Sequence, residues 1–148
     1  MSARMNSVRL PRINGVVETI LYVDDLERAI LFYRDFLGLR PMSGDAVRFQ
    51  SFDSGAEGRV LLLFKRGATL VPVTVSGGVI PPHNGRGPHH IGFAIAADDY
   101  EPWLSRVKES GIAIESEGRW ERGGRSMYFR DPDGHLLELI TPGIWEIY

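Results

Sequence analysis

The strongest constraint on the fold of this chain is that the order of its predicted elements occurs twice. Residues 16–23 (VVETILYV) are rich in β-branched side chains, which favours a strand, and a helical pattern follows as far as Gly38. After a stretch rich in Gly and Pro, a strand pattern and then a helical pattern that ends at Gly111 follow in the same order. Gly38 and Gly111 lie 73 positions apart, and Glu18 and His90 lie 72 apart. This near-constant spacing indicates an internal repeat.

Each half also contains strand patterns after its helix. They lie at 46–52 and 59–65 in the first half, and at 112–115, 126–130 and 136–140 in the second. Residues 76–88 carry too little apolar pattern for a regular element, so we interpret them as a linker or a long binding loop. We therefore predict an α+β fold of two tandem βαβββ modules, at about residues 15–75 and 88–143, that curl around a shared cleft.

Composition indicates a soluble globular protein with one core. The chain has 148 residues, of which 43% are hydrophobic and 24% charged. A net charge of -2 argues against nucleic acid or an anionic membrane as the main partner, and no apolar run approaches the length of a membrane span. The absence of cysteine excludes disulfides and thiolate ligands. Residues 1–14 lack the apolar core of a secretory signal, so we expect a flexible N-terminal arm before a single cytoplasmic domain at 15–148.

Three ionisable residues stand at strand positions where the pattern predicts aliphatic side chains. Glu138 lies inside the apolar run 136–140, and strand alternation places it on a face with two aliphatic residues. A lone buried carboxylate is costly unless it is paired, protonated or bound to a cation. Glu18 and His90 occupy equivalent positions in the first strands of the two modules.

If the modules curl around a shared cleft, these three side chains converge on one site. Two carboxylates and one imidazole without sulfur suit one divalent metal ion, namely Mn²⁺, Mg²⁺, Fe²⁺, Ni²⁺ or Zn²⁺. Three protein ligands leave positions for water or substrate oxygens, as in catalytic rather than structural sites. We predict Glu18, His90 and Glu138 as ligands. The competing interpretations are an ion pair or helix cap for Glu18, a core histidine at His90 with His89 as the functional residue, and a scaffold role for Glu138.

Side chains around the second-module hairpin are candidates for substrate binding. An arginine-lined, aromatic mouth suits an anionic or oxygen-rich small molecule, whereas a solvated basic loop is the competing interpretation. The candidates are Arg119, Trp120, Arg125 and Tyr128. We expect His135, which follows the DPDG turn, to be structural. We expect His83, in the loop, to be solvated rather than to contact substrate.

Three segments carry a resemblance to a known family. In this order, ETILYVDDLERAILFYRDFLGL, HHIGFAI and MYFRDPDGHLLEL resemble the vicinal oxygen chelate superfamily, which contains glyoxalases, bleomycin-resistance proteins, fosfomycin-resistance proteins and extradiol dioxygenases. The resemblance covers about residues 15–143. It implies that Glu18, His90 and Glu138 bind metal, because metal-dependent members use these positions. The chain departs from glyoxalase I-like members at Leu62, where they have a fourth ligand, and from fosfomycin-type members at Glu18, where they usually have histidine.

The resemblance implies a metal-dependent enzyme that binds a small, oxygen-rich substrate through two neighbouring oxygens. We expect lyase or isomerase chemistry first, then thiol transfer to an epoxide, then ring-opening dioxygenation. Glu18 or Glu138 would move a proton. The alternative is a non-catalytic, drug-sequestering protein of the bleomycin-resistance type, which predicts an apolar, aromatic cleft and no metal. The superfamily also implies a homodimer whose clefts contain residues from both chains.

Overall fold

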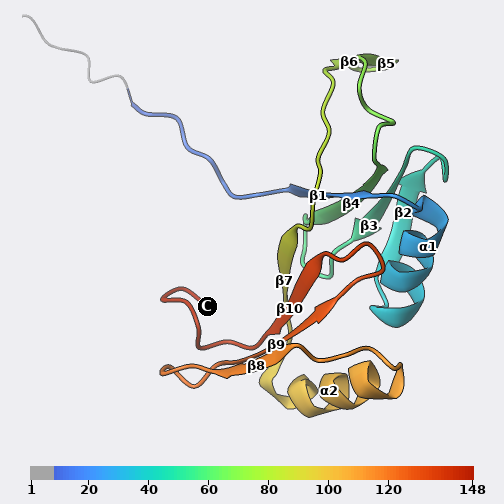
Figure 1. Ribbon diagram of the computed structural model, residues 1–148. Helices are drawn as coiled ribbons and strands as arrows, with labels where there is room; N and C mark the ends of the chain where they lie inside the picture. Colours follow the sequence, from blue (N-terminus) through green and yellow to red (C-terminus); the bar gives the residue numbers. More distant parts are fainter. Residues whose placement is uncertain (1–8) are drawn as a thin grey trace, which may run out of the picture.

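The computed structural model describes residues 9–148, which form two four-stranded sheets and a separate hairpin (Figure 1). The first sheet has the order β1-β4-β3-β2, with β1 (Glu18–Val23), β2 (Arg40–Gly44), β3 (Phe49–Asp53) and β4 (Val60–Lys65). The second has the order β7-β10-β9-β8, with β7 (His90–Ala94), β8 (Ser116–Arg119), β9 (Arg125–Arg130) and β10 (Leu136–Ile140). In both, the first strand pairs in parallel with the last, and the other pairs are antiparallel. The predicted α+β fold of two tandem modules is therefore confirmed.

Each module has one main helix after its first strand. In the first module, α1 (Leu26–Leu31) continues into the π-helical turn η1 (Phe32–Phe36); in the second, η2 (Ala97–Asp99) leads into α2 (Tyr100–Glu109). Asp25 caps α1, because its carboxylate accepts a hydrogen bond from the Arg28 amide at 3.0 Å. Gly38 and Gly111, the two glycines that mark the repeat, both have a φ of +75°, which allows the chain to turn after each helix.

Three predictions from the sequence differ from the structure. The strand β2 was not predicted, because it is an edge strand with all five residues exposed and so lacks an alternating apolar pattern. The short strand expected at 112–115, after the second helix, lies at Ser116–Arg119 instead. The expected loop at 76–88 begins inside a hairpin of β5 (Val73–Val75) and β6 (Gly78–Ile80), which a two-residue turn connects. Of the expected arm, residues 1–8 lie outside the described part, and residues 9–14 are exposed without regular structure.

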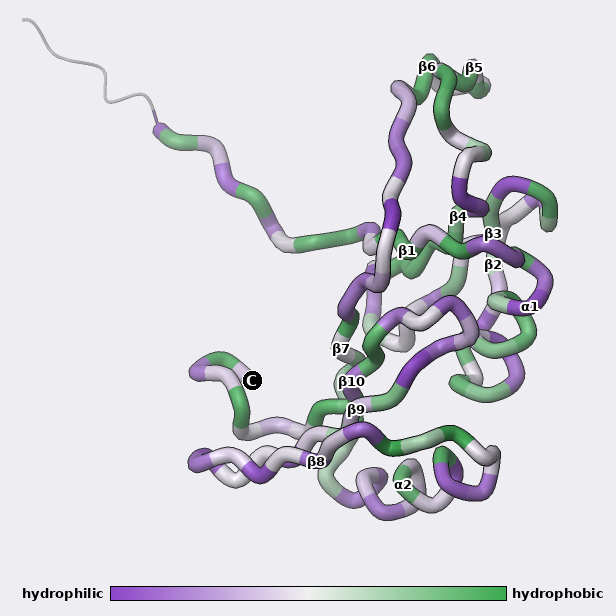
Figure 2. Tube along the Cα trace, in the orientation of Figure 1, coloured by the Kyte–Doolittle hydropathy of each residue, from purple (hydrophilic) through white to green (hydrophobic). Residues whose placement is uncertain are grey.

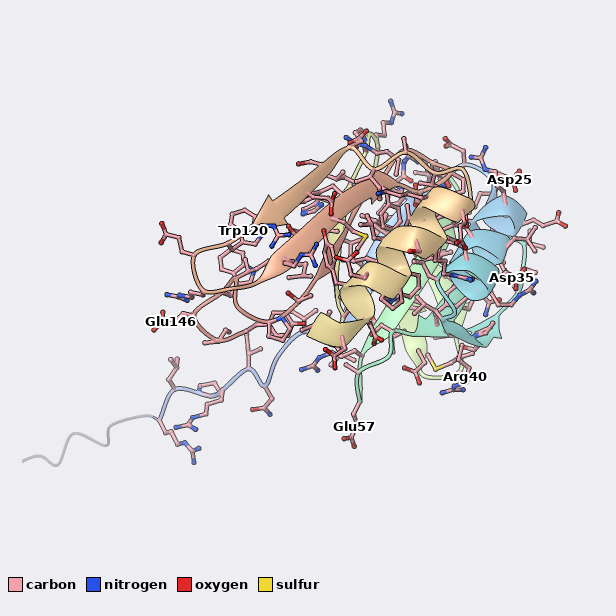
Figure 3. The ribbon with its side chains drawn as sticks, turned by 90° about the horizontal axis from the view of Figure 1, so that it is seen from below. Asp25, Asp35, Arg40, Glu57, Trp120 and Glu146 are labelled. Carbon is pink, nitrogen blue, oxygen red and sulfur yellow. The ribbon has the colours of Figure 1, made fainter. Side chains whose placement is uncertain are left out.

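The two modules share one core, which lies on the helical face of both sheets. Leu21 and Leu61 of the first sheet and Leu137 and Leu139 of the second are almost completely buried there. The helices lie side by side (Figure 3), and Arg106 of α2 donates hydrogen bonds to the carbonyls of residues 35 and 36, each at 2.9 Å. Alternation along the strands therefore leaves the opposite faces, which carry Glu18 and Glu138, outside this core.

The turn before β10 connects the two modules. His135 is fully buried, its Nδ1 accepts a hydrogen bond from the His89 amide at 2.8 Å, and its Nε2 lies 2.7 Å from the Tyr22 carbonyl oxygen. Since a carbonyl only accepts, Nε2 carries the proton. The buried carboxylate of Asp131 accepts the Tyr33 hydroxyl at 2.7 Å. His135 is therefore structural, as expected.

None of the helices found between residues 9 and 148 is long and apolar enough to cross a lipid bilayer.

Replacing Tyr33 with Phe tests the connection between α1 and the turn of the second module. The variant removes the donor to a buried carboxylate, so we expect unfolding to become easier by about 1.5–3 kcal/mol. Urea unfolding monitored by circular dichroism measures the change. Tyr148→Phe is the control: its hydroxyl bonds the Ile140 carbonyl at an exposed position, and its loss should cost less than about 0.5 kcal/mol. Equal effects of the two variants would contradict this role for Tyr33.

Candidate functional site

His90 and Glu138 lie next to each other on neighbouring strands. The parallel register of β7 and β10 pairs His90 with Leu136 and Gly92 with Glu138, so both side chains project from the same region of the sheet. His90 Nε2 is 3.6 Å from Glu138 Oε2, and Nδ1 is 3.0 Å from the carbonyl oxygen of Leu136. Because the carbonyl can only accept, Nδ1 carries a proton. In neutral His90, Nε2 therefore carries a lone pair and lies near the Glu138 carboxylate.

This arrangement is the one that a metal-binding imidazole uses. A backbone carbonyl on one ring nitrogen fixes the tautomer and leaves the other nitrogen free to coordinate. Two ligand atoms bound at about 2.1 Å to one ion lie about 3–3.5 Å apart, close to the separation of this pair. The Glu138 side chain is only 11% exposed, so its charge favours a cationic partner. The residues present therefore fit one end of a divalent metal site.

Tyr128 lies next to this pair, on the neighbouring strand β9. It is opposite Glu138 in the antiparallel register of β9 and β10, and its ring stacks on His90 with 6.3 Å between centroids. Burial, and secondly the Glu138 carboxylate, raise the pKa of Tyr128 above its usual value, so its hydroxyl keeps its proton. Tyr128 can therefore orient the imidazole and offer a donor to a ligand.

Glu18, the third predicted ligand, lies in the other sheet. It is exposed on a face shared with Ile20 and Tyr22, and it lines a cavity of about 420 Å³ whose walls all belong to residues 18–83. Within residues 9–148 of one chain, no three His, Cys, Asp or Glu side chains come close enough to hold a metal ion. The expectation that three ligands meet in a cleft is thus not met within a single chain. Glu18 lies on the open face of the first sheet, and His90 and Glu138 lie on the second sheet.

The predicted substrate-binding residues separate into two groups. Trp120 and Tyr128 line one shallow hollow near Glu115, whereas Arg119 and Trp120 line another with the C-terminal tail. Figure 3 shows Trp120 and Glu146, a residue of that tail, at the same end of the molecule.

Arg125 differs from the others because its guanidinium is engaged within the protein. Its Nη1 donates to Glu101 at 2.8 Å, and its guanidinium lies 3.7 Å from the centroid of the Tyr100 ring. The open mouth expected from the sequence does not include this side chain as a free cation.

His83 was expected to be solvated, and this expectation is wrong. Its Nδ1 lies 2.6 Å from the Tyr22 hydroxyl, its ring packs edge-on against Phe64, and it lines the same cavity as Glu18. The signal that could have identified this region is the VTVSGGVI segment, in which β-branched residues flank a two-residue turn. The hairpin places the following loop, and with it His83, over the first sheet.

Two tandem βαβββ modules define the class of fold to which this protein belongs, and the comparisons agree. Residues 12–139 match the Glyoxalase/Bleomycin resistance protein/Dioxygenase superfamily, and the chain belongs to it. The resemblance to the vicinal oxygen chelate group is therefore confirmed.

Individual relatives differ in their named activities. The chain is 30% identical over 130 residues to "Metallothiol transferase FosB" of Staphylococcus epidermidis, covering 87% of this chain and 84% of that protein. It is 31% identical over 135 residues to "Fosfomycin resistance protein FosX" of Listeria monocytogenes, covering 86% and 89%. The crystal structure of a lactoylglutathione lyase from Agrobacterium tumefaciens superposes with a TM-score of 0.81 at 29% identity, covering 92% and 99%. These relatives include metal-dependent enzymes, and none of them fixes the reaction of this chain.

Replacing Arg125 with Gln tests whether this arginine is structural. The variant loses the bond to Glu101 and the contact over Tyr100, so we expect a lower urea midpoint of unfolding. Arg119→Gln is the matched control on the neighbouring strand β8, and its midpoint should equal that of the wild type. An unchanged midpoint in the Arg125 variant would contradict the structural role.

Proposed function

We propose that the protein is a divalent-metal-dependent enzyme whose metal site forms between two copies of the chain. In this arrangement His90 and Glu138 of one copy and Glu18 of the other hold one ion. The observation that carries the proposal is the His90–Glu138 pair, which has its imidazole tautomer fixed by the Leu136 carbonyl and a nearly buried carboxylate.

The strand order supports a site between copies. β1 and β7 are both edge strands, so each first strand has one unpaired side at which a second copy can pack. Val16 and Val17, just before β1, are exposed apolar residues, as a contact surface requires. A homodimer that puts the open face of one first module against the open face of the partner's second module brings carboxylate and imidazole ligands together.

The substrate in this proposal is a small molecule that offers two neighbouring oxygens. A bound divalent ion supplies Lewis-acid stabilisation of negative charge on such oxygens. Three protein ligands leave room for the substrate oxygens. Glu138 is nearly buried beside His90, whereas Glu18 is exposed on its cavity, so Glu18 is the better placed of the two to accept a proton from bound substrate. This favours lyase or isomerase chemistry, which needs a carbon-bound proton to move.

A specific observation also favours the alternative of a sequestering protein. The cavity beside Glu18 is walled largely by aliphatic and aromatic side chains, as a drug-binding cleft would be. The enzyme requires a bound metal ion and the sequestering protein does not, so a measurement of metal binding distinguishes the two functions.

Complementation between two inactive variants tests the site between copies. Glu18→Gln and Glu138→Gln should each lower Mn²⁺ affinity by about 100-fold or more, because each removes a ligand. When the two variants are co-expressed with different tags and the mixed dimer is purified, one of its two sites regains all three ligands. We expect one tightly bound Mn²⁺ per mixed dimer by equilibrium dialysis and none in either parent.

The controls make this result specific. Glu146→Gln, which neutralises an exposed carboxylate in the C-terminal tail, should leave Mn²⁺ binding unchanged. A mixed dimer that binds no ion while the wild type binds two would place the site within one chain. Unaltered Mn²⁺ binding by Glu138→Gln would remove the metalloenzyme proposal and leave the sequestering function.

Solvent exchange tests the reaction class. With Mn²⁺ present, the wild type should exchange the carbon-bound proton next to the carbonyl of an α-hydroxyketone such as hydroxyacetone in D₂O, as measured by ¹H NMR. At Mn²⁺ concentrations that saturate both proteins, Glu18→Gln should lower this rate by at least about 100-fold, which is the typical contribution of a positioned base. Mn²⁺-loaded wild-type protein that exchanges no faster than free Mn²⁺ would contradict a proton-transfer enzyme for this class of substrate.

A further inference from the structure

The cavity beside Glu18 has a composition that limits what can occupy it. It lies between the open face of the first sheet and the segment that leads into and out of the β5–β6 hairpin. Figure 2 shows the hairpin itself to be largely hydrophobic, and Figure 1 shows it projecting away from both sheets. The apolar part of the wall consists chiefly of Ile20, Leu62, Val73, Ile80 and the stacked rings of Phe49 and Phe64, whose centroids are 5.6 Å apart.

His83 provides a fixed polar group in this apolar wall. Its backbone amide donates to the Thr69 carbonyl at 2.9 Å, and the Thr69 hydroxyl donates to the His83 carbonyl. Burial raises the pKa of Tyr22, so its phenol keeps the proton and can donate it to His83 Nδ1. Neutral His83 then carries its own proton on Nε2, which has no hydrogen-bond partner among residues 9–148.

Arg48 also lines the wall. Its Nε is buried and makes no hydrogen bond within the described residues, and its nearest anionic neighbour, Asp45, is 3.6 Å away. The Asp45 carboxylate is therefore the counter-charge of this guanidinium. The cavity therefore presents much carbon surface and, at His83, a polar donor.

We propose that this cavity is the specificity pocket of the site, and that it binds an apolar substituent of aryl size that carries an oxygen acceptor for His83. The inference rests on the proposed function and adds the class of substrate. A volume of about 420 Å³ exceeds the roughly 150 Å³ that suffices for benzene in an apolar cavity, so a substituted ring fits. A small phosphonate dianion fits poorly, because it would lose its hydration against a wall made mainly of carbon.

Two acids with the same metal-binding group test the pocket. Lactate and mandelate both offer a carboxylate next to a hydroxyl, and they differ only in a methyl against a phenyl group. We expect the Mn²⁺-loaded protein to bind mandelate at least about 10-fold more tightly than lactate, because the ring buries more apolar surface. Isothermal titration calorimetry measures both dissociation constants. Equal affinities would overturn the proposal.

A matched pair of tryptophan variants locates the effect. Val73→Trp on β5 should fill the cavity and reduce the preference for mandelate to less than about 2-fold, with Mn²⁺ affinity unchanged. Val79→Trp makes the same change on β6, at an exposed residue that does not line the cavity, and should keep the preference. Both positions lie outside the two main sheets, so neither variant disturbs the shared core. A preference that survives Val73→Trp would overturn the proposal.

Binding of ring-hydroxylated mandelates tests the role of His83 as a hydrogen-bond donor. We expect at least one of the three ring-hydroxylated mandelates to bind several-fold more tightly than mandelate to the wild type, and to lose this gain in His83→Phe. The phenylalanine keeps a ring against Phe64 but has no donor. Retention of the gain in this variant, or no gain with any isomer, would remove the acceptor oxygen from the proposal.

Failure of the pocket and failure of the proposed function give different results. If the wild type binds no Mn²⁺, the metal-dependent function fails, and the pocket is then tested in metal-free protein with benzyl alcohol. Shifts of the Ile20 and Leu62 methyl signals in ¹³C-methyl NMR, absent in Val73→Trp, would support the pocket. No shifts would overturn it. If Mn²⁺ binds and the two acids bind equally, only the pocket fails.

Discussion

Hydrogen bonds between the turn of the second module and the first module hold the fold in one arrangement. His135 bonds the carbonyl of Tyr22 in β1 and the amide of His89 at the start of β7, and Asp131 in the same turn accepts the Tyr33 hydroxyl from η1. The side chains of His135, Asp131 and Tyr33 are buried, so leaving any of them unpaired is costly. The turn therefore fixes the first strands of both modules relative to each other, and with them the faces that carry Glu18 and His90.

Because the modules are fixed in this arrangement, one face of each sheet is buried in the shared core and the opposite face lies outside it. In β10, Leu137 and Leu139 point into the shared core, and Glu138 alternates to the opposite face. The same alternation in β1 buries Leu21 and turns Glu18 outward. Since each open face lies on its own sheet, a site that needs both faces requires a second copy of the chain. In the dimer that we propose, the His90–Glu138 pair and the Glu18 cavity are two parts of one site.

Much of the fold and part of the candidate site could be predicted from the sequence, because both follow from local patterns. The repeat and the alternation around Glu138 depend on neighbours in the chain, and the structure agrees with both. The strand Arg40–Gly44 escaped prediction because an exposed edge strand needs no apolar face. The roles of His83 and Arg125 escaped it because their partners, Tyr22 and Glu101, are 61 and 24 positions away.

Family membership alone identifies neither the reaction nor the substrate, whereas the cavity beside Glu18 gives information about the substrate. Relatives of similar identity are named as a metallothiol transferase and as a fosfomycin resistance protein, and a lyase superposes well. Residues that hold a metal are compatible with all three chemistries, so they do not discriminate between substrates. The walls of the pocket do: Phe49, Phe64 and the hairpin residues present carbon to whatever the metal holds. Burial of apolar surface favours a ring there, whereas a compact dianion would lose hydration without enough compensating donors. In the proposed site, substrate choice therefore depends on the hairpin between the modules, whereas the proposed metal ligands specify only that oxygen atoms bind.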